Sequence, residues 1–189
     1  MIKDLVVSGI VQEHFSKTSS CASLIVDQLN SGLYARCEKY MRDKLVIDVG
    51  ANIGLFTLYA SQFAESVLSV EPTQSHQEVF NCLMEDNAIT NVKLLKAALS
   101  TENKVLDFYE STSNSTMNSL FNYEPASTTS YQVQGMRLKD ILESVEGDLG
   151  VIKIDIEGSE KFLLEDEQFF KSLQNTNSLF VEVHEVDGK

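Results

Sequence analysis

Short apolar runs alternate along the chain with segments that have helical spacing. Residues 45–49, 67–70 and 151–156 are rich in Val, Ile and Leu, as strands buried on both faces of a parallel sheet are. Residues 55–63 and 75–87 place apolar side chains three and four positions apart, which is typical of a helix with one buried face. The alternation predicts an α/β fold with a mostly parallel central sheet flanked by helices.

Further strands are expected after these elements. Residues 92–99 and 179–183 would belong to the parallel set, and residues 105–109 and 131–134 to an additional pair. Residues 111–130 are dense in Ser, Thr and Asn, so we expect an exposed loop there.

A glycine turn follows the first apolar run. Gly50 ends that run and helical spacing begins at Leu55, so the turn joins a strand to a helix, where open α/β sheets hold ligands. Gly50 can adopt a backbone conformation that side chains disfavour, and Gly54 permits a close approach of the helix. Asp48 is a carboxylate in an apolar strand and needs a partner. A purely structural turn explains these residues equally well when they are taken alone.

Glu71 ends the next apolar run, and Pro72 cannot continue the strand. An acid roughly 20 residues beyond a glycine turn is placed to accept hydrogen bonds from a ribose. Asn52 stands where a dinucleotide-binding turn would have its second glycine, and no Gly-Lys-Ser/Thr element occurs. The pattern favours a nucleoside ligand without phosphates over the nicotinamide cofactor of an oxidoreductase. His76, early in the following helix, is expected to be exposed.

Acidic residues also follow the strand at residues 151–156. Asp155, Glu157 and Glu160 would lie at the same edge of the sheet as the glycine turn, with His184 after the last strand. They could cap a helix, hold or deprotonate a substrate, or bind a divalent cation. Capping is favoured for Glu160 and substrate chemistry for the other two acids. His184 is a candidate base or a structural residue, and no metal site is assigned.

Five segments give the chain a resemblance to the FkbM-type S-adenosylmethionine-dependent methyltransferases. They are Asp48-Val-Gly-Ala-Asn-Ile-Gly54, Val70-Glu-Pro72, Lys96-Ala-Ala-Leu-Ser100, Ile152-Lys-Ile-Asp-Ile-Glu-Gly-Ser-Glu160 and Glu182-Val-His184. The resemblance implies a Rossmann-like methyltransferase fold, S-adenosylmethionine as cofactor, and methyl transfer, usually to an oxygen of a sugar, polyketide or other small molecule. Catalytic candidates are His184, Asp155 and Glu157, and the cofactor-binding positions are Asp48, Gly50, Ala51, Asn52, Gly54, Glu71, Pro72, Ala97 and Ala98.

The chain is expected to divide into an N-terminal helical segment, residues 1–43, and an S-adenosylmethionine-binding methyltransferase domain, residues 44–189. Methyltransferases that it resembles usually continue into an antiparallel hairpin, which is expected here to be missing or replaced by the strands between Val105 and Gln134. A non-catalytic or partner-dependent cofactor-binding subunit is therefore an alternative to an enzyme.

The composition restricts the kinds of partner that the protein is expected to bind. The formal net charge of −13 disfavours nucleic acid and anionic membranes, which attract basic surfaces. Three scattered cysteines with no C-x-x-C pair predict reduced thiols and a cytoplasmic location. The sequence has no run of about 20 apolar residues, so no membrane span is predicted. The expected partner is a small-molecule acceptor that carries a hydroxyl group.

Overall fold

The computed structural model describes residues 32–111, 118–120, 122, 128–174 and 176–184. Its centre is a five-stranded sheet with the strand order β3-β2-β1-β7-β8, in which each neighbouring pair is parallel. The strands are β1 (Leu45–Val49), β2 (Ser66–Val70), β3 (Val92–Leu95), β7 (Leu149–Ile154) and β8 (Ser178–Val181). The parallel α/β fold expected from the apolar runs is confirmed.

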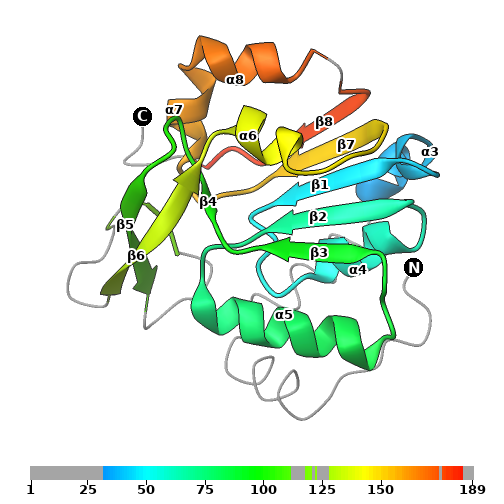
Figure 1. Cartoon of the computed structure of the whole chain (residues 1–189), viewed down its shortest axis with the longest axis horizontal. Coiled ribbons are helices and arrows are strands. Elements are labelled where there is room, and N and C mark those ends of the chain that lie inside the picture. Colours follow the sequence, from blue (N-terminus) through cyan, green and yellow to red (C-terminus); the bar gives the residue numbers. More distant parts are fainter. Residues whose placement is uncertain (1–31, 112–117, 121, 123–127, 175, 185–189) are drawn as a thin grey trace.

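Helices cover both faces of this sheet and give the molecule three layers (Figure 1). One face packs against η1 (Tyr34–Cys37), α3 (Glu38–Met41), α4 (Leu55–Ser61) and α5 (Gln74–Asp86). The other face packs against α6 (Leu138–Glu143), α7 (Glu160–Leu164) and α8 (Glu167–Ser172).

Alternate residues of the central strand supply the two cores. Val46 belongs to the first core, whereas Ile47 belongs to the second. Successive side chains of a strand point to opposite faces, so a strand that is covered on both sides must be apolar at nearly every position. Asp48 is the exception in β1, and its side chain is fully buried.

A second, three-stranded sheet lies beside the carboxyl ends of the main sheet (Figure 1). It contains β4 (Ala98–Leu99), β5 (Val105–Ser111) and β6 (Thr128–Met136) in the order β4-β6-β5. The single strand expected over residues 92–99 is therefore wrong. Lys96 and Ala97 separate a strand that pairs with β2 from one that pairs with β6.

Of the two alternatives expected for the C-terminal hairpin, missing or replaced, the structure contradicts replacement by the strands between Val105 and Gln134. β5 and β6 pair antiparallel with each other, but β6 continues the pairing to β4 and neither strand joins the main sheet. Within the described residues, β8 is the edge of that sheet.

The described part of the N-terminal segment is short. Of residues 1–43, positions 1–31 lie outside the described residues, and positions 34–41 form a 3₁₀ turn followed by one turn of α-helix. Tyr34 anchors this segment because its ring packs 4.8 Å from that of Phe56 and 5.1 Å from that of Phe180. No described helix is long and apolar enough to cross a membrane.

Candidate active site at the carboxyl ends of the parallel strands

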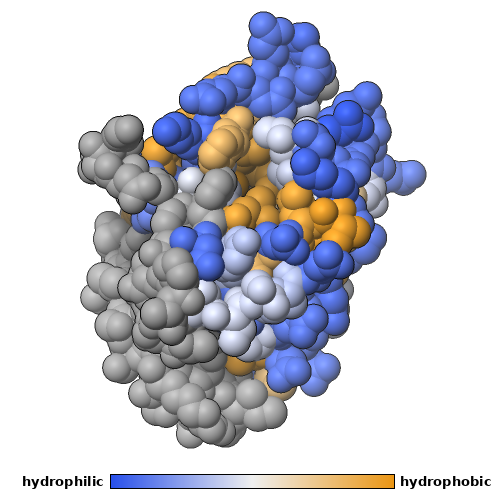
Figure 2. All heavy atoms as spheres, turned by 90° about the vertical axis from the view of Figure 1, so that its left-hand side faces the viewer, coloured by the Kyte–Doolittle hydropathy of each residue, from blue (hydrophilic) through white to orange (hydrophobic). Residues whose placement is uncertain are grey.

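A pocket opens where β1, β2 and β7 end, beside the second sheet. Its volume, including the solvent-filled mouth, is about 540 Å³. Figure 2 looks onto this side of the molecule and shows hydrophobic side chains at the centre of the face with hydrophilic ones around them.

The glycine turn forms one side of this pocket. Gly50 has φ +73°, and a Cβ atom there would lie 1.7 Å from the backbone oxygen of Asp155. Gly54 has φ +92°, and a Cβ atom there would lie 2.6 Å from the ring of Phe80. The first glycine therefore allows the turn to touch the loop after β7, and the second allows α4 to pack on α5.

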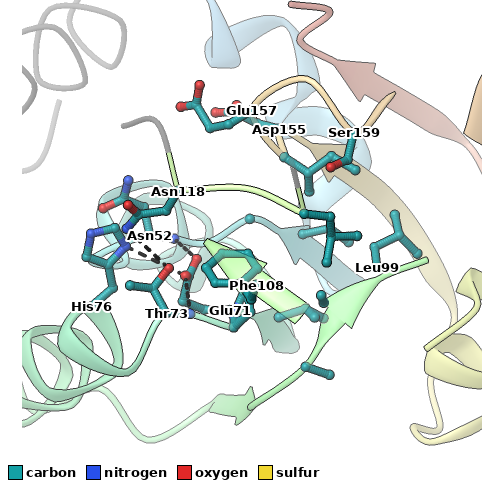
Figure 3. Close-up of a pocket in the computed structure, with 18 residues that line it drawn as sticks. Asn52, Glu71, Thr73, His76, Leu99, Phe108, Asn118, Asp155, Glu157 and Ser159 are labelled. Carbon is teal, nitrogen blue, oxygen red and sulfur yellow. Dashed lines mark hydrogen bonds and ion pairs between the residues drawn. The ribbon is translucent and has the colours of Figure 1, made fainter. Parts of the chain in front are cut away.

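Glu71 stands at the tip of β2 with only 4% of its surface exposed. Its Oε2 accepts a hydrogen bond of 2.7 Å from the backbone N–H of Asn52, and its Oε1 accepts one of 2.8 Å from the N–H of Thr73. Oε1 also lies 3.6 Å from Nδ1 of His76, whose side chain is 2% exposed. The exposed position expected for His76 is wrong, because the first turn of α5 directs its ring toward Glu71 (Figure 3).

The electrostatics of Glu71 follow from these contacts. Burial alone would raise its pKa, but the interactions with His76 and Thr73 outweigh burial and hold the pKa below the usual value. Glu71 is therefore an ionised acceptor inside the pocket.

A buried lysine lies beneath the pocket. Nζ of Lys153 donates a hydrogen bond of 3.0 Å to the backbone oxygen of Gly50 and lies 3.4 Å from Oδ1 of Asp48 and 3.3 Å from Oδ2 of Asp155. Burial would lower its pKa, but the carboxylates of Asp48 and Asp155 raise it. Asp48 also accepts a hydrogen bond of 2.6 Å from Oγ1 of Thr57, so this buried carboxylate has the partners that its position in an apolar strand requires.

Asp155 and Glu157 form an acidic rim, which lies on the opposite side of the pocket from Glu71 (Figure 3). His184, after β8, brings Nε2 to 3.4 Å from Oε2 of Glu157 and 3.9 Å from Oδ1 of Asp155. These three groups offer ligand atoms within 4.8 Å of one another, which is close enough to hold a divalent cation.

Glu160 organises this rim from below. Its side chain is 1% exposed, and its oxygens accept backbone hydrogen bonds from Ile156 (2.8 Å) and Gly158 (2.9 Å). Oε1 also lies 3.3 Å from Nδ1 of His184. Glu160 therefore binds the turn before α7 and not the first N–H groups of the helix that it was expected to cap, and it also orients the imidazole.

The proton affinities of the rim are shifted by these neighbours. The hydrogen bond to Glu160 raises the pKa of His184 to about 9. Burial and the charge of Asp155 raise the pKa of Glu157 to about 8. At neutral pH, His184 is consequently an imidazolium that faces carboxyl groups.

A short segment of the connection between β5 and β6 closes over the pocket. Asn118 and Ser119 are 7% and 1% exposed, so the expectation of an exposed loop is wrong at these positions. Ser119 pairs with Tyr109 of β5 through two backbone hydrogen bonds, and its hydroxyl donates one of 2.9 Å to the backbone oxygen of Glu157. Asn118 accepts a hydrogen bond of 2.9 Å from the N–H of Ser111. The segment thus ties the second sheet to the acidic rim.

Most of the predicted site residues meet in the pocket. Those that line it are Gly50, Asn52, Glu71, Pro72, Ala97, Ala98, Asp155 and Glu157. Asp48, Ala51, Gly54 and His184 are not part of the lining, although His184 contacts the lining residue Glu157.

Sequence reasoning missed several residues of the site. Thr73, His76, Phe108 and Asn118 line the pocket, and Lys153 lies beneath it. A signal was available for Lys153, because a charged residue in a buried apolar strand requires a partner just as Asp48 does. The spacing of apolar residues does not indicate Asn118, because its place depends on pairing between segments that are distant in the chain.

The three-layer fold, with a pocket at the carboxyl ends of its parallel strands, defines a Rossmann-like α/β protein. The chain belongs to the FkbM methyltransferase family, because residues 48–189 match the methyltransferase FkbM domain. Methyltransferase 1 of Beauveria bassiana (strain ARSEF 2860) is 30% identical over 143 residues, which are 65% of this chain and 57% of that protein. The chain thus spans little more than half the length of this relative.

Solved structures with similarity to this chain are more distant. Methyltransferase FkbM from Methylobacillus flagellatus KT is 16% identical, with 69% of this chain and 30% of that chain covered and a TM-score of 0.45. SMU.1697c from Streptococcus mutans, solved in complex with SAH, is 18% identical, with 32% and 38% covered and a TM-score of 0.30.

Proposed function

We propose that this protein transfers a methyl group from S-adenosylmethionine to a hydroxyl group of a small molecule or sugar. The observation that supports this most is that carboxylates lie on two opposite sides of one pocket. Glu71 lies on one side, and Asp155 and Glu157 lie on the other. One side suits the ribose of the cofactor, and the other suits the proton that an attacking hydroxyl must lose.

The residues on the first side fit S-adenosylmethionine. Glu71 is buried and ionised, so it can accept a hydrogen bond from a ribose hydroxyl. Ala97, Leu99 and Phe108 are buried and apolar, and they offer a surface for the adenine ring. The glycine turn brings backbone close to the ligand without a side chain to obstruct it.

When bound, S-adenosylmethionine supplies a methyl group that is already activated as an electrophile. The protein therefore has to align the acceptor oxygen, exclude water and remove one proton. The strap of Asn118 and Ser119 narrows the pocket, which helps to exclude water.

We assign Glu157 as the base that accepts the proton of the acceptor hydroxyl. A general base works best when its pKa lies near the operating pH, and the pKa of Glu157 is raised to about 8. His184 is already protonated at neutral pH because Glu160 raises its pKa to about 9, so it stabilises the negative charge of the rim instead of accepting the proton. Asp155 orients the acceptor beside Glu157.

Calorimetric titration of the purified protein with S-adenosylmethionine, its product S-adenosylhomocysteine and NAD tests the cofactor. We expect the first two to bind and NAD to be inert. Replacement of Glu71 by Gln should weaken S-adenosylhomocysteine binding about tenfold or more, because it removes a charged hydrogen-bond acceptor. The matched control is Glu110→Gln, a carboxylate of β5 that does not line the pocket.

Methyl transfer is then tested by release of S-adenosylhomocysteine in the presence of a panel of sugars, polyols and phenols. Turnover with a hydroxyl acceptor that is lost in Glu157→Gln would support the assignment. Binding of NAD without S-adenosylmethionine would favour the oxidoreductase alternative. Cofactor binding with no turnover on any acceptor class would favour a non-catalytic or partner-dependent subunit.

A further inference from the structure

His76 is a buried polar residue of the pocket, and packing alone does not explain its position. It lies in the first turn of α5, is 2% exposed and lines the same pocket as Glu71. Figure 3 shows its ring beside Asn118 and directed toward the Glu71 carboxylate. A histidine buried in this way costs free energy unless its polar nitrogen atoms interact.

The contacts of Glu71 indicate what His76 does. A carboxylate can accept about four hydrogen bonds, two at each oxygen. Oε1 is used by the N–H of Thr73 and lies 3.6 Å from Nδ1 of His76, whereas Oε2 is used by the N–H of Asn52 alone. Oε1 therefore faces a second polar group, the imidazole of His76, whereas no second side chain of the described residues is recorded at Oε2.

The ionisation of Glu71 also indicates a role for His76. Glu71 is almost fully buried, and burial favours the protonated acid, which would present an O–H donor in place of an acceptor. Among the described groups that hold its pKa down, His76 has the largest effect. The backbone N–H groups of Asn52 and Thr73 fix the orientation of the carboxylate, and the ring of His76 faces the same oxygen as the N–H of Thr73.

We infer that His76 is a positioning residue for ribose recognition, which faces Oε1 of Glu71 with Nδ1 and so holds the carboxylate with Oε2 available to a cofactor hydroxyl. This inference rests on the proposed use of the pocket for S-adenosylmethionine. It adds a residue to the cofactor site that neither the motifs nor the spacing along the chain indicate.

Calorimetry with two ligands and four forms of the protein tests the inference. The ligands are S-adenosylhomocysteine and an analogue that lacks both ribose hydroxyls. The proteins are the wild type, His76→Ala, His76→Asn and His76→Phe. Asn keeps a donor near the position of Nδ1, whereas Phe keeps the volume of the ring without its nitrogen atoms. The matched control is Glu78→Ala, an exposed position of the same helix.

We expect His76→Ala and His76→Phe to weaken S-adenosylhomocysteine binding about tenfold or more, because the buried carboxylate loses the polar group that faces Oε1. His76→Asn should stay within about threefold of the wild type, because its amide keeps an N–H donor that can face Glu71. The analogue should bind the wild type and the variants with equal, weaker affinity. Glu78→Ala should behave as the wild type with both ligands.

Equal loss for both ligands would assign His76 a purely structural role and overturn the inference, as would unchanged affinity in His76→Ala. Failure of Asn to restore affinity would exclude Nδ1 as the acting atom and also overturn it. Should His76→Ala not fold, His76→Phe and His76→Asn give the same comparison. A wild type that binds neither ligand would instead refute the proposed function, and this inference with it, so the two failures are distinguishable.

Discussion

Nζ of Lys153 lies 3.3 Å from the carboxylate of Asp155 while it donates a hydrogen bond to the backbone oxygen of Gly50. One buried ammonium group thus joins the glycine turn on one side of the pocket to an acid on the other side.

Replacement of Lys153 by Met should lower the free energy of unfolding by about 3–5 kcal/mol, because a buried carboxylate loses its partner. The carboxylate is that of Asp48, which is fully buried. Chemical denaturation measures the change. The double variant Asp48→Asn with Lys153→Met removes both charges and should recover part of the loss; a double variant less stable than the single one would contradict this account.

Gly50→Ala should abolish detectable cofactor binding and destabilise the fold. A Cβ atom at this position would lie 1.7 Å from the backbone oxygen of Asp155, so the turn or the loop after β7 must move. Gly32→Ala is the control, since Gly32 also has positive φ (+75°) but meets no atom within 4 Å. The control should lose only about 1–2 kcal/mol of stability, the usual cost of a left-handed backbone for a residue with a side chain. Thermal melting and calorimetry distinguish the two effects.

The stability of the protein should fall as the pH rises past neutrality. The pKa of His184 is raised from 6.5 to about 9 in the folded state, so its contribution is fully present below pH 6.5 and is lost as the pH passes through about 9. His184→Gln removes this contribution. Denaturation at pH values across this window should show the wild type losing stability relative to the variant, and parallel curves would argue against the ion pairs of His184.

Turnover should increase with pH through about 8, where Glu157 loses its proton and becomes a competent base. The measurement is the pH dependence of kcat with a hydroxyl acceptor at saturating cofactor. Glu157→Gln should have low activity with no inflection near this pH. An unchanged inflection in the variant would assign it to another group.

Chelation of divalent cations with EDTA should leave methyl transfer and S-adenosylhomocysteine affinity unchanged. Asp155, Glu157 and His184 could together bind a cation, but the imidazolium of His184 already places a positive charge among these carboxyl groups. Loss of activity in EDTA that is restored by Mg²⁺ or Mn²⁺ would show that the rim holds a metal ion.

The sequence alone determined which segments form the parallel strands and at which end of those strands the pocket lies. Both are consequences of local properties. A β-branched run between helical segments is typical of a buried parallel strand, and Gly50, Glu71 and Asp155 each come at the end of such a run. Residues at the ends of parallel strands necessarily share one edge of the sheet, so eight of the predicted site residues line one pocket.

Only the tertiary structure decided the contacts that assign roles within that pocket. Hydrophobic spacing cannot show that the chain breaks at Lys96 and Ala97 to begin a second sheet, because the break depends on whether the next residues pair with β2 or β6. Likewise, the burial of His76 beside Glu71 and of Ser119 beside Glu157 depends on distances between segments that are not neighbours in the chain. The charges of His184 and Glu157 follow from those distances, because a pKa reports the groups that folding brings into contact.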